Sequence, residues 1–479
     1  MADTKISALT SGAPAQAGDE YVIARSGANY KLTGTNLLGL VTSTANTFTA
    51  TQTFGIADVT TLEASNLRAL DGTAAATIAN STGVIAVSTK VEYADGTAAA
   101  PTVTNTGDTD TGVYFPAANE VAVSAGGTVA AGFNSNGLFF RNRIINGDMR
   151  IDQRNAGAAV TTTGTYTVDR FTQAFAIASC SFQQVADAPA GFVNSLKLTV
   201  TTGSAPSVGT NNVILQRIEG LNVADLAFGT ASALTVTVSF WAKASVTGTY
   251  AVSLTNSAFN RSYVATYVVN SANTWEYKTV TIAGDTTGTW LTTNGTGLIV
   301  LWDFGSGTNL NTTAGAWQAG NFYRTSACTT IASTTNATLQ ITGVQLETGS
   351  VATPFERRPY GTELMLCQRY CQKLAGDTAY TVVTDGWQSA TTSGTFTYSF
   401  GNPMRASPTL TTGTVGDFYA RNASIASALS TLALDGGLSS TKETVSFSAT
   451  WAGAGGAAGY GAQLVSGANA PRVILSAEL

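Results

Sequence analysis

The side chains most often used for covalent and metal chemistry are scarce in this sequence. None of its 479 residues is histidine, which excludes Ser-His-Asp and Cys-His nucleophile systems and any imidazole-bound metal. The four cysteines are Cys180, Cys328, Cys367 and Cys371, and only the last two lie close together. A zinc site would need a second close pair of ligands, so we expect Cys367 and Cys371 to be small buried apolar residues. The sequence therefore predicts no cofactor and no metal site.

Carboxylates alone could still support glycosidase chemistry. Such an enzyme needs two of them, set about 5 to 9.5 Å apart across the scissile bond. The candidates Asp285, Asp303, Asp417 and Asp435 are scattered along the chain, and no spacing singles out a pair. We therefore expect no catalytic residues, with a glycan-cleaving enzyme as the alternative.

Aromatic side chains beside amides and hydroxyls provide a different signal, because flat rings and hydrogen-bonding groups together recognise sugars. Trp290 lies in a turn-rich stretch that also holds Asn294, and Trp317 lies in the loop-like residues 313–321. We expect these three residues to contact a ligand. Alternatively, the two tryptophans fold over the edge of their domain or contact a neighbouring protomer.

A second candidate surface is the glycine-rich stretch 451–461, which holds Trp451 and Tyr460 at its ends. Glycine adopts backbone angles that other residues resist, so an exposed adhesive loop is one interpretation. A plain connection between strands is the other. A phosphate-binding loop is not supported, because the Lys-Ser/Thr ending is missing. Trp302, by contrast, lies in an apolar run and is predicted to pack in a core.

The composition restricts the partners that this chain can have. Charged residues make up 11%, against roughly 25% in typical soluble domains. Small neutral residues replace them, which favours sheets over long helices. The net charge of −5 argues against nucleic-acid binding and against a polybasic membrane contact. No apolar stretch approaches twenty residues and the first eleven lack a signal-peptide core, so we expect no membrane insertion and assembly in the cytoplasm.

The first part of the chain divides into two segments. Residues 1–40 form a small module, and residues 41–140 are rich in threonine and alanine, with DGTAAA at 71–76 and again at 95–100. A single copy of the second segment buries too little apolar area to offset its ordering entropy. Either it is disordered or three chains wound about one axis share a core. The regular spacing of Val, Ile, Phe and Tyr favours the shared core.

Residues 141–361 are predicted to form a β-sandwich, because apolar and polar residues alternate in runs such as 196–200 and 234–240. Trp241 follows the second run on the same strand face as Lys243, so exposure or an interface is expected there. Trp275 and Tyr277 likewise share one strand face.

The last part of the chain begins with a predicted helix, residues 362–375, which Thr362 can cap. Cys367 and Cys371 would then lie on one helical face. Residues 376–479 are predicted to form a second β-sandwich.

Three segments resemble the tail fibres of tailed bacteriophages: residues 1–9, residues 142–154 with 168–171, and residues 343–359 with 363–370. The first is similar to fibre N-termini that attach to the tail. The other two look like the two ends of one domain found in phage fibres and receptor-binding proteins. Between them, the sequence is similar in style to jelly-roll carbohydrate-binding modules. The resemblance implies a homotrimer that attaches to a tail or baseplate protein through its N-terminus and has a distal C-terminal tip.

The chain is accordingly expected to be mainly β and to form an elongated homotrimeric fibre. Its parts would be an N-terminal attachment module, an intertwined β shaft, a jelly-roll β-sandwich and a C-terminal β-sandwich tip. The expected function is that of a non-enzymatic virion protein that attaches to bacterial surface polysaccharide or lipopolysaccharide. A structural tail connector and a glycan-depolymerising tailspike are the alternatives.

The second and third of these segments also concentrate charge in an otherwise neutral chain. We expect their charged residues to pair where the two ends of the domain meet, or between protomers. Buried pairs of this kind fix register more than they add stability. The residues concerned are Arg143, Arg150, Arg154, Arg170, Glu347, Glu356 and Arg358.

Overall fold

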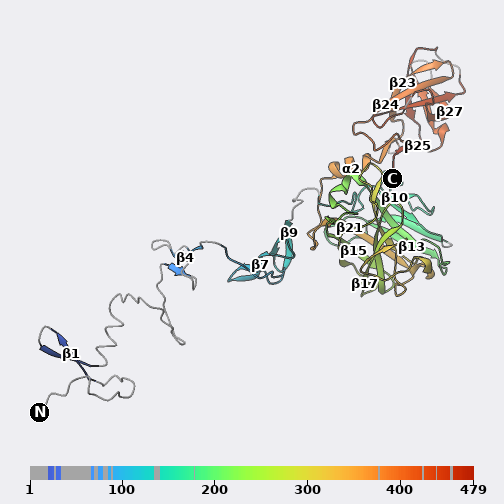
Figure 1. Ribbon diagram of the computed structural model, residues 1–479. Coiled ribbons are helices and arrows are strands. Elements are labelled where there is room, and N and C mark those ends of the chain that lie inside the picture. Colours follow the sequence, from blue (N-terminus) through green and yellow to red (C-terminus); the bar gives the residue numbers. More distant parts are fainter. Residues whose placement is uncertain are drawn as a thin grey trace. The chain divides into compact units, whose positions relative to one another are not determined.

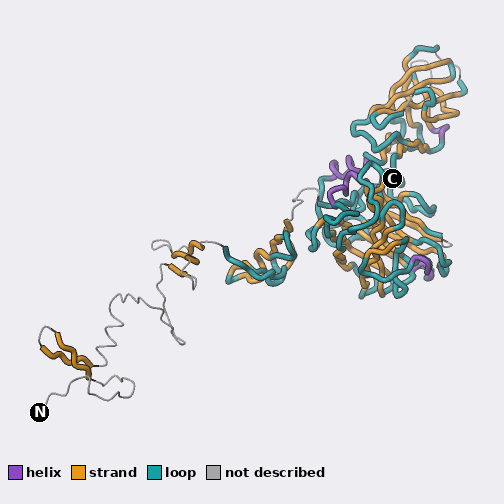
Figure 2. Tube along the Cα trace, viewed as in Figure 1, coloured by secondary structure: helices purple, strands orange, loops and turns teal. Residues whose placement is uncertain are grey.

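The computed structural model describes residues 90–133, 141–176, 179–375, 378–422, 426–438, 440–453 and 457–479, together with five strands before residue 90. The chain divides into two compact units, residues 1–92 and 93–479. Strands dominate the described residues, and helical pieces are short (Figure 2). The expected mainly β composition is confirmed. No helix in these ranges is both long and apolar enough to span a membrane.

The first unit holds two small antiparallel sheets (Figure 1). β1 (Glu20–Arg25) pairs with β2 (Ala28–Thr33) inside the predicted attachment module. The second sheet contains β3 (Asn66–Arg68), β4 (Ala74–Ile78) and β5 (Ile85–Val87). The fibre-like residues 1–9 lie outside the described residues.

The second unit begins with a four-stranded antiparallel sheet. Its strands, in order, are β6 (Val103–Asn105), β7 (Asp108–Tyr114), β8 (Val121–Ala125) and β9 (Thr128–Phe133). In this register Val113 lies opposite both Val103 and Val123, and Val123 lies opposite Ala131. Because directly opposed residues share a face, these four apolar side chains form one row across the sheet.

Two antiparallel sheets then form a β-sandwich, as expected for residues 141–361. The seven-stranded sheet runs β10 (Tyr166–Val168), β11 (Phe171–Ala174), β14 (Val213–Glu219), β19 (Thr296–Asp303), β16 (Gly248–Thr255), β17 (Arg261–Val269) and β20 (Trp317–Ala319). The five-stranded sheet runs β12 (Ser179–Val185), β13 (Ser195–Thr202), β21 (Thr338–Thr348), β15 (Val236–Ala244) and β18 (Glu276–Ile282). Four 3-10 helices lie in the connections: η2 (Gly220–Asn222), η3 (Ala224–Leu226), η4 (Thr308–Leu310) and η5 (Ile331–Ser333).

The inner faces of the two sheets make the core. Alternate residues of the predicted runs point inward, among them Leu198 and Val238, which are fully buried. Trp302 is buried between Phe171 and Phe240, with ring centroids 6.4 and 5.6 Å away. Its prediction as a core residue is confirmed.

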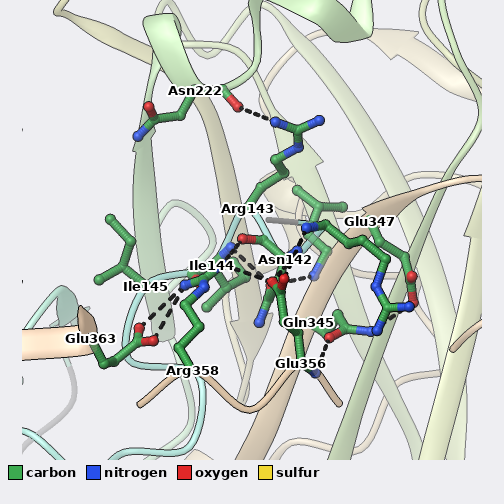
Figure 3. A network of polar contacts seen from close by, with 12 residues as sticks. Asn142, Arg143, Ile144, Ile145, Asn222, Gln345, Glu347, Glu356, Arg358 and Glu363 are labelled. Atoms are coloured by element: carbon green, nitrogen blue, oxygen red, sulfur yellow. Dashed lines mark hydrogen bonds and ion pairs between the residues drawn. The ribbon is translucent and has the colours of Figure 1, made fainter. Parts of the chain in front are cut away.

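The two ends of the sandwich sequence meet in a buried polar network (Figure 3). The guanidinium of Arg358 donates to the carbonyl oxygens of Asn142 and Ile144 and lies 3.2 and 3.4 Å from the carboxylates of Glu356 and Glu363. Glu356 in turn accepts a hydrogen bond of 2.9 Å from the Asn142 backbone NH. The expectation that charges pair where the ends meet is confirmed for Arg358 and Glu356.

The other charged residues of these segments have different partners. Arg143 pairs with Asp225 at 2.5 Å, and Arg150 pairs with Asp148 nearby in sequence. Glu347 accepts hydrogen bonds from Gln345 and Thr353 and forms no ion pair with an arginine among the described residues. Arg154 and Arg170 both pair with Glu478, close to the last residue of the chain.

The helix predicted for residues 362–375 is only partly correct. Helix α2 (Tyr360–Gln368) begins after Pro359, so Thr362 lies inside it and not at its cap. Residues Cys371–Ala375 form strand β22, because a partner strand, β30 (Val473–Ser476), arrives from the end of the chain. Cys367 and Cys371 are both buried, as expected, but they do not share one helix face.

The C-terminal region is a closed barrel, not the expected sandwich. The barrel order is β23 (Val382–Ala390), β24 (Ser393–Ser399), β28 (Thr444–Trp451), β27 (Ala426–Leu434), β26 (Phe418–Arg421) and β29 (Gly461–Ser466). It closes because β23 pairs with β24 on one side and with β29 on the other. The short 3-10 helix η6 (Val415–Asp417) precedes β26.

A three-stranded sheet joins this barrel to the sandwich. β30 pairs with β22 on one side and with β25 (Thr409–Thr412) on the other. Leu479 packs against the buried residues Ile145 and Ile151 of the sandwich. The last residues of the chain therefore return to the sandwich.

Candidate functional site

The two outer faces of the sandwich differ in how they are covered. On the seven-stranded sheet, Leu215 and Ile299 lie beneath Leu310 and Tyr323, which belong to the segment after β19. On the five-stranded sheet, the loops 186–194 and 349–357 cross parts of the outer face. The sheet, these loops and residues 98 and 127–129, which precede the sandwich, line a groove of about 710 Å³.

Four aromatic rings follow one another along this groove. Trp241 on β15 and Tyr277 on β18 are opposite each other in the ladder, with ring centroids 5.4 Å apart. Phe192 and Phe355 come from the two loops, and their centroids are 5.2 Å apart. We call Tyr277, Trp241, Phe192 and Phe355 the aromatic row. The Tyr277 side chain is well exposed, with 44% of its surface accessible.

A glycine in β21 allows the two pairs of rings to meet. Between Gln345 and Thr342, β21 holds one residue more than β15, which is a β-bulge. Gly343 in this bulge has a φ of +60°, and a Cβ there would lie 2.7 Å from the Phe192 ring and 3.1 Å from Trp241. Only glycine lets both rings approach the backbone this closely.

Charged and amide groups lie beside the aromatic row. Asp187 accepts hydrogen bonds from Lys243 at 2.5 Å, Gln340 at 3.1 Å and the Trp275 indole at 3.3 Å. We call these four residues the Asp187 cluster. Hydrogen bonding from the Lys243 ammonium holds the pKa of Asp187 below its ordinary value.

A second cation lies at the other end of the aromatic row. The Arg357 guanidinium lies over Phe192 at 4.7 Å and near Phe355 at 5.9 Å. Thr279 and Thr281 are exposed along β18 and add hydroxyls to the same groove. Flat rings flanked by hydroxyl, amide and charged groups are the side chains that hold a sugar.

The structure places the predicted residues Trp290 and Trp317 together at the edge of the sandwich. Their rings pack edge to face at 5.3 Å, and both pack against Phe228. The Trp317 indole donates to the Ala283 carbonyl at 2.7 Å, and the Trp290 indole lies 3.3 Å from Asp285. These contacts match the alternative in which both rings fold over the sandwich edge.

The remaining predicted residues, unlike these two tryptophans, are not brought together. Asn294 is exposed, and its backbone carbonyl accepts from Arg405 at 2.9 Å. Trp451 is only 2% exposed because it points into the barrel core at the end of β28, so it presents no surface to a ligand. Tyr460 is 60% exposed. Residues 454–456 of the glycine-rich loop lie outside the described residues.

No sequence pattern identifies the loop side chains Phe192, Phe355 and Asp187 as part of a site. Strand alternation did mark Trp241 with Lys243, and Trp275 with Tyr277, as outward-facing pairs. No periodicity extends into the loops, so nothing in the sequence placed Phe192 or Phe355 over the sheet. Within the described residues, no group of three or more Cys, Asp or Glu could hold a metal ion.

Comparisons with known proteins give structural matches only. No family model and no curated protein matches the sequence. The structure is similar to the enzymatically active domain of tailspike protein 4 of bacteriophage CBA120, with 14% identity over 43% of this chain and a TM-score of 0.24. The match spans only 21% of that tailspike chain.

Smaller proteins match over nearly their whole length. One is a CBM4 module, with 14% identity over 43% of this chain and 98% of that one, and a TM-score of 0.23. Another is the family 11 carbohydrate-binding module of the cellulase Lic26A-Cel5E of Clostridium thermocellum, with 12% identity over 41% and 97% and a TM-score of 0.21.

Proposed function

We propose that this chain is a bacteriophage tail fibre, a structural protein of the virion that attaches to the host surface by binding glycan. The observation that carries the proposal is the groove on the five-stranded sheet, where the aromatic row runs beside the Asp187 cluster. The tail-fibre part of the proposal rests on the sequence resemblance of residues 142–154 and 343–359.

The groove suits a polysaccharide or the glycan of lipopolysaccharide. Trp241 and Tyr277 offer ring faces against which the apolar side of a pyranose can lie. Lys243 and the threonines of β18 offer hydrogen-bonding groups for hydroxyls.

Removal of the Trp241 and Tyr277 rings tests whether this groove binds glycan. In the full-length protein, Trp241→Ala with Tyr277→Ala should weaken binding to purified host polysaccharide or lipopolysaccharide about tenfold or more, because buried aromatic anchors dominate such contacts. Affinity electrophoresis measures this. The matched control is Tyr380→Ala, which removes an exposed ring from the C-terminal region. Equal binding by the double variant and the control would refute the role of this groove.

The proposal also includes a non-enzymatic role. Asp285 is paired with Arg261 at 2.5 Å, and Asp303 lies 3.4 Å from Arg324. Each buried carboxylate is thus occupied by its own arginine, which supports a structural use of both. Incubation of the protein with host polysaccharide should release no reducing ends. A rise in reducing ends would favour a depolymerising tailspike.

We further propose that the fibre is a homotrimer with a core shared by the β6–β9 sheets. The face that carries the row Val103, Val113, Val123 and Ala131 also carries Val121 and Phe133, which are 38% and 40% exposed. Tyr114 and Ala122 are buried on the opposite face. A sheet this small cannot bury both faces alone, so further copies of the chain would supply the missing cover.

Light scattering tests the trimer. The full-length protein should have about three times its chain mass of 49.1 kDa. Replacing Val103 and Val121 by Asp should shift it towards one chain mass, because charges would be buried without partners. Thr106→Asp, in the turn between β6 and β7, should leave the mass unchanged. A wild-type mass of one chain would contradict the shared core.

The N-terminus is proposed to attach to a tail or baseplate protein. This part of the proposal rests on residues 1–9, whose sequence resembles fibre attachment segments. A variant without them should bind host glycan normally but be absent from purified virions.

A further inference from the structure

The C-terminal barrel has a second polar hollow, separate from the groove on the sandwich. It has a volume of about 640 Å³, and strands β23, β26 and β29 contribute to its lining. Its lining residues are Asp385, Gly386, Arg421, Asn422, Gly461, Ala462 and Gln463.

Charged and amide side chains form a row across the floor of this hollow. In the ladder, Gln463 on β29 lies opposite Arg421 on β26 and opposite Asp385 on β23. All three side chains are exposed and so point away from the barrel core. Because neighbouring strands are about 4.8 Å apart, Arg421 and Asp385 lie on strands about 10 Å apart, with Gln463 between them. That span can receive one small molecule.

The two ends of this row have different contacts. Gln463 donates to Asp385 at 3.1 Å, which fixes the acidic end. The Arg421 side chain makes no hydrogen bond or ion pair within the described residues of the chain. An unpaired guanidinium keeps all five donors, in a planar fork that matches a carboxylate or phosphate.

A tryptophan stands on the next row of the same face. Trp387 lies opposite Gly461 in the ladder and is 44% exposed. Gly461 has no side chain, and nothing lies within 4 Å of where its Cβ would be, so the space beside the indole is open. A ring face beside an open, polar floor suits a pyranose.

We propose that this hollow binds a single anionic sugar unit, a pyranose that carries a carboxylate or a phosphate. Arg421 pairs with the anionic group, Asp385 and Gln463 bind ring hydroxyls, and the pyranose lies against Trp387. This site belongs to the barrel and is independent of the glycan groove on the sandwich. A neutral sugar lacks the group that the Arg421 guanidinium recognises.

Binding to the full-length protein by saturation-transfer NMR tests the proposal. The probes are glucuronate, glucose 6-phosphate, methyl glucoside and acetate. Binding of at least one of the two anionic sugars should reach saturation. That sugar should bind roughly tenfold or more tightly than methyl glucoside or acetate. The preferred sugar then tells a carboxylate source from a phosphate source. If neither anionic sugar saturates, or if acetate or the neutral sugar binds equally well, the proposal is overturned.

Variants separate this site from the sandwich groove. Arg421→Gln should reduce the affinity for the anionic sugar to that for methyl glucoside, and Trp387→Ala should weaken both. Trp241→Ala, on the sandwich, should change neither. Unaltered anion binding by Arg421→Gln, or its loss in Trp241→Ala, would reject a site on the barrel. All three positions are at least partly exposed, and thermal unfolding checks that each variant is folded.

Discussion

The outer faces of the two sandwich sheets consist of similar strands but differ in what covers them. One face is buried beneath other residues of the chain, and the other borders a groove. On the seven-stranded sheet, Leu310 and Tyr323 pack over Leu215 and Ile299 and cover them. On the five-stranded sheet, Trp241 and Tyr277 border an open groove. The outer face of the seven-stranded sheet therefore forms a small core of its own. The outer face of the five-stranded sheet leaves aromatic rings in contact with solvent. The comparison separates residues that stabilise the sandwich from residues that can meet a ligand.

The largest effect is expected on the covered face. Arg324 is buried, donates to the carbonyl oxygens of Ser306 and Cys328, and lies 3.4 Å from Asp303. Arg324→Ala should lower the free energy of unfolding by about 3–5 kcal/mol, because it leaves a buried carboxylate without its partner. Urea unfolding measures this.

The matched control for Arg324 is an arginine of the open face. Arg357 is exposed and makes its contacts with Phe192 and Phe355. Arg357→Ala should change the free energy of unfolding by about 0.5 kcal/mol or less. Equal losses of stability in Arg324→Ala and Arg357→Ala would contradict the distinction between a stabilising covered face and a ligand-accessible open face.

A smaller effect on stability is expected at the bulge below the aromatic row. Gly343→Ala should cost roughly 1–2 kcal/mol, because the residue has a φ of +60° and its new Cβ would meet the Phe192 ring. Gly343→Ala should also weaken glycan binding, because the Phe192 ring must move away from the new Cβ. The control is Gly361→Ala in helix α2, where nothing lies within 4 Å of the new Cβ and stability should not fall. Normal glycan binding by Gly343→Ala would show that the position of Phe192 is unimportant.

The smallest effect concerns the Asp187 cluster and pH. The pKa of Asp187 is depressed in the folded chain, so the stability it contributes is present above its ordinary value of 3.8 and is lost as pH falls below that value. The pair with Lys243 is partly exposed, so the loss should be under about 1 kcal/mol. Comparison of wild type with Asp187→Asn between pH 7 and pH 3 measures it. A difference that disappears already near pH 6 would contradict the depressed pKa.

The two tryptophan groups of the sandwich show where strand periodicity is informative. Trp241 and Lys243 lie two apart on β15, so alternation alone places them on one outward face. Trp290 and Trp317 are predicted to meet a ligand because turn-like sequence surrounds them. In the structure, Phe228 packs against both of these rings, although it lies far from them in the sequence. That packing is a long-range contact that turn-like sequence does not reveal.

The barrel also depends on strand pairing between segments that lie far apart in the sequence. Alternation predicts its strands at 396–400 and 445–451, and they pair as β24 with β28. Alternation cannot tell a sandwich from a barrel, because both point every second residue inward. Closure depends on β23 pairing with β29, which lies far along the chain. For the same reason, local sequence predicts a helix for the residues of β22, whereas pairing with the distant β30 makes them a strand.

By itself, the sequence determined the mainly β character, the core position of Trp302 and the clustering of charged residues where the ends of the sandwich meet. These features depend on local alternation, apolar runs and clustered charge, which neighbouring residues encode. Only the tertiary structure decided which outer face stays open, that Phe192 and Phe355 line the same groove as Trp241, and that Trp451 is buried in the barrel while Trp387 is exposed. Those outcomes depend on contacts between distant segments, and no local pattern carries them.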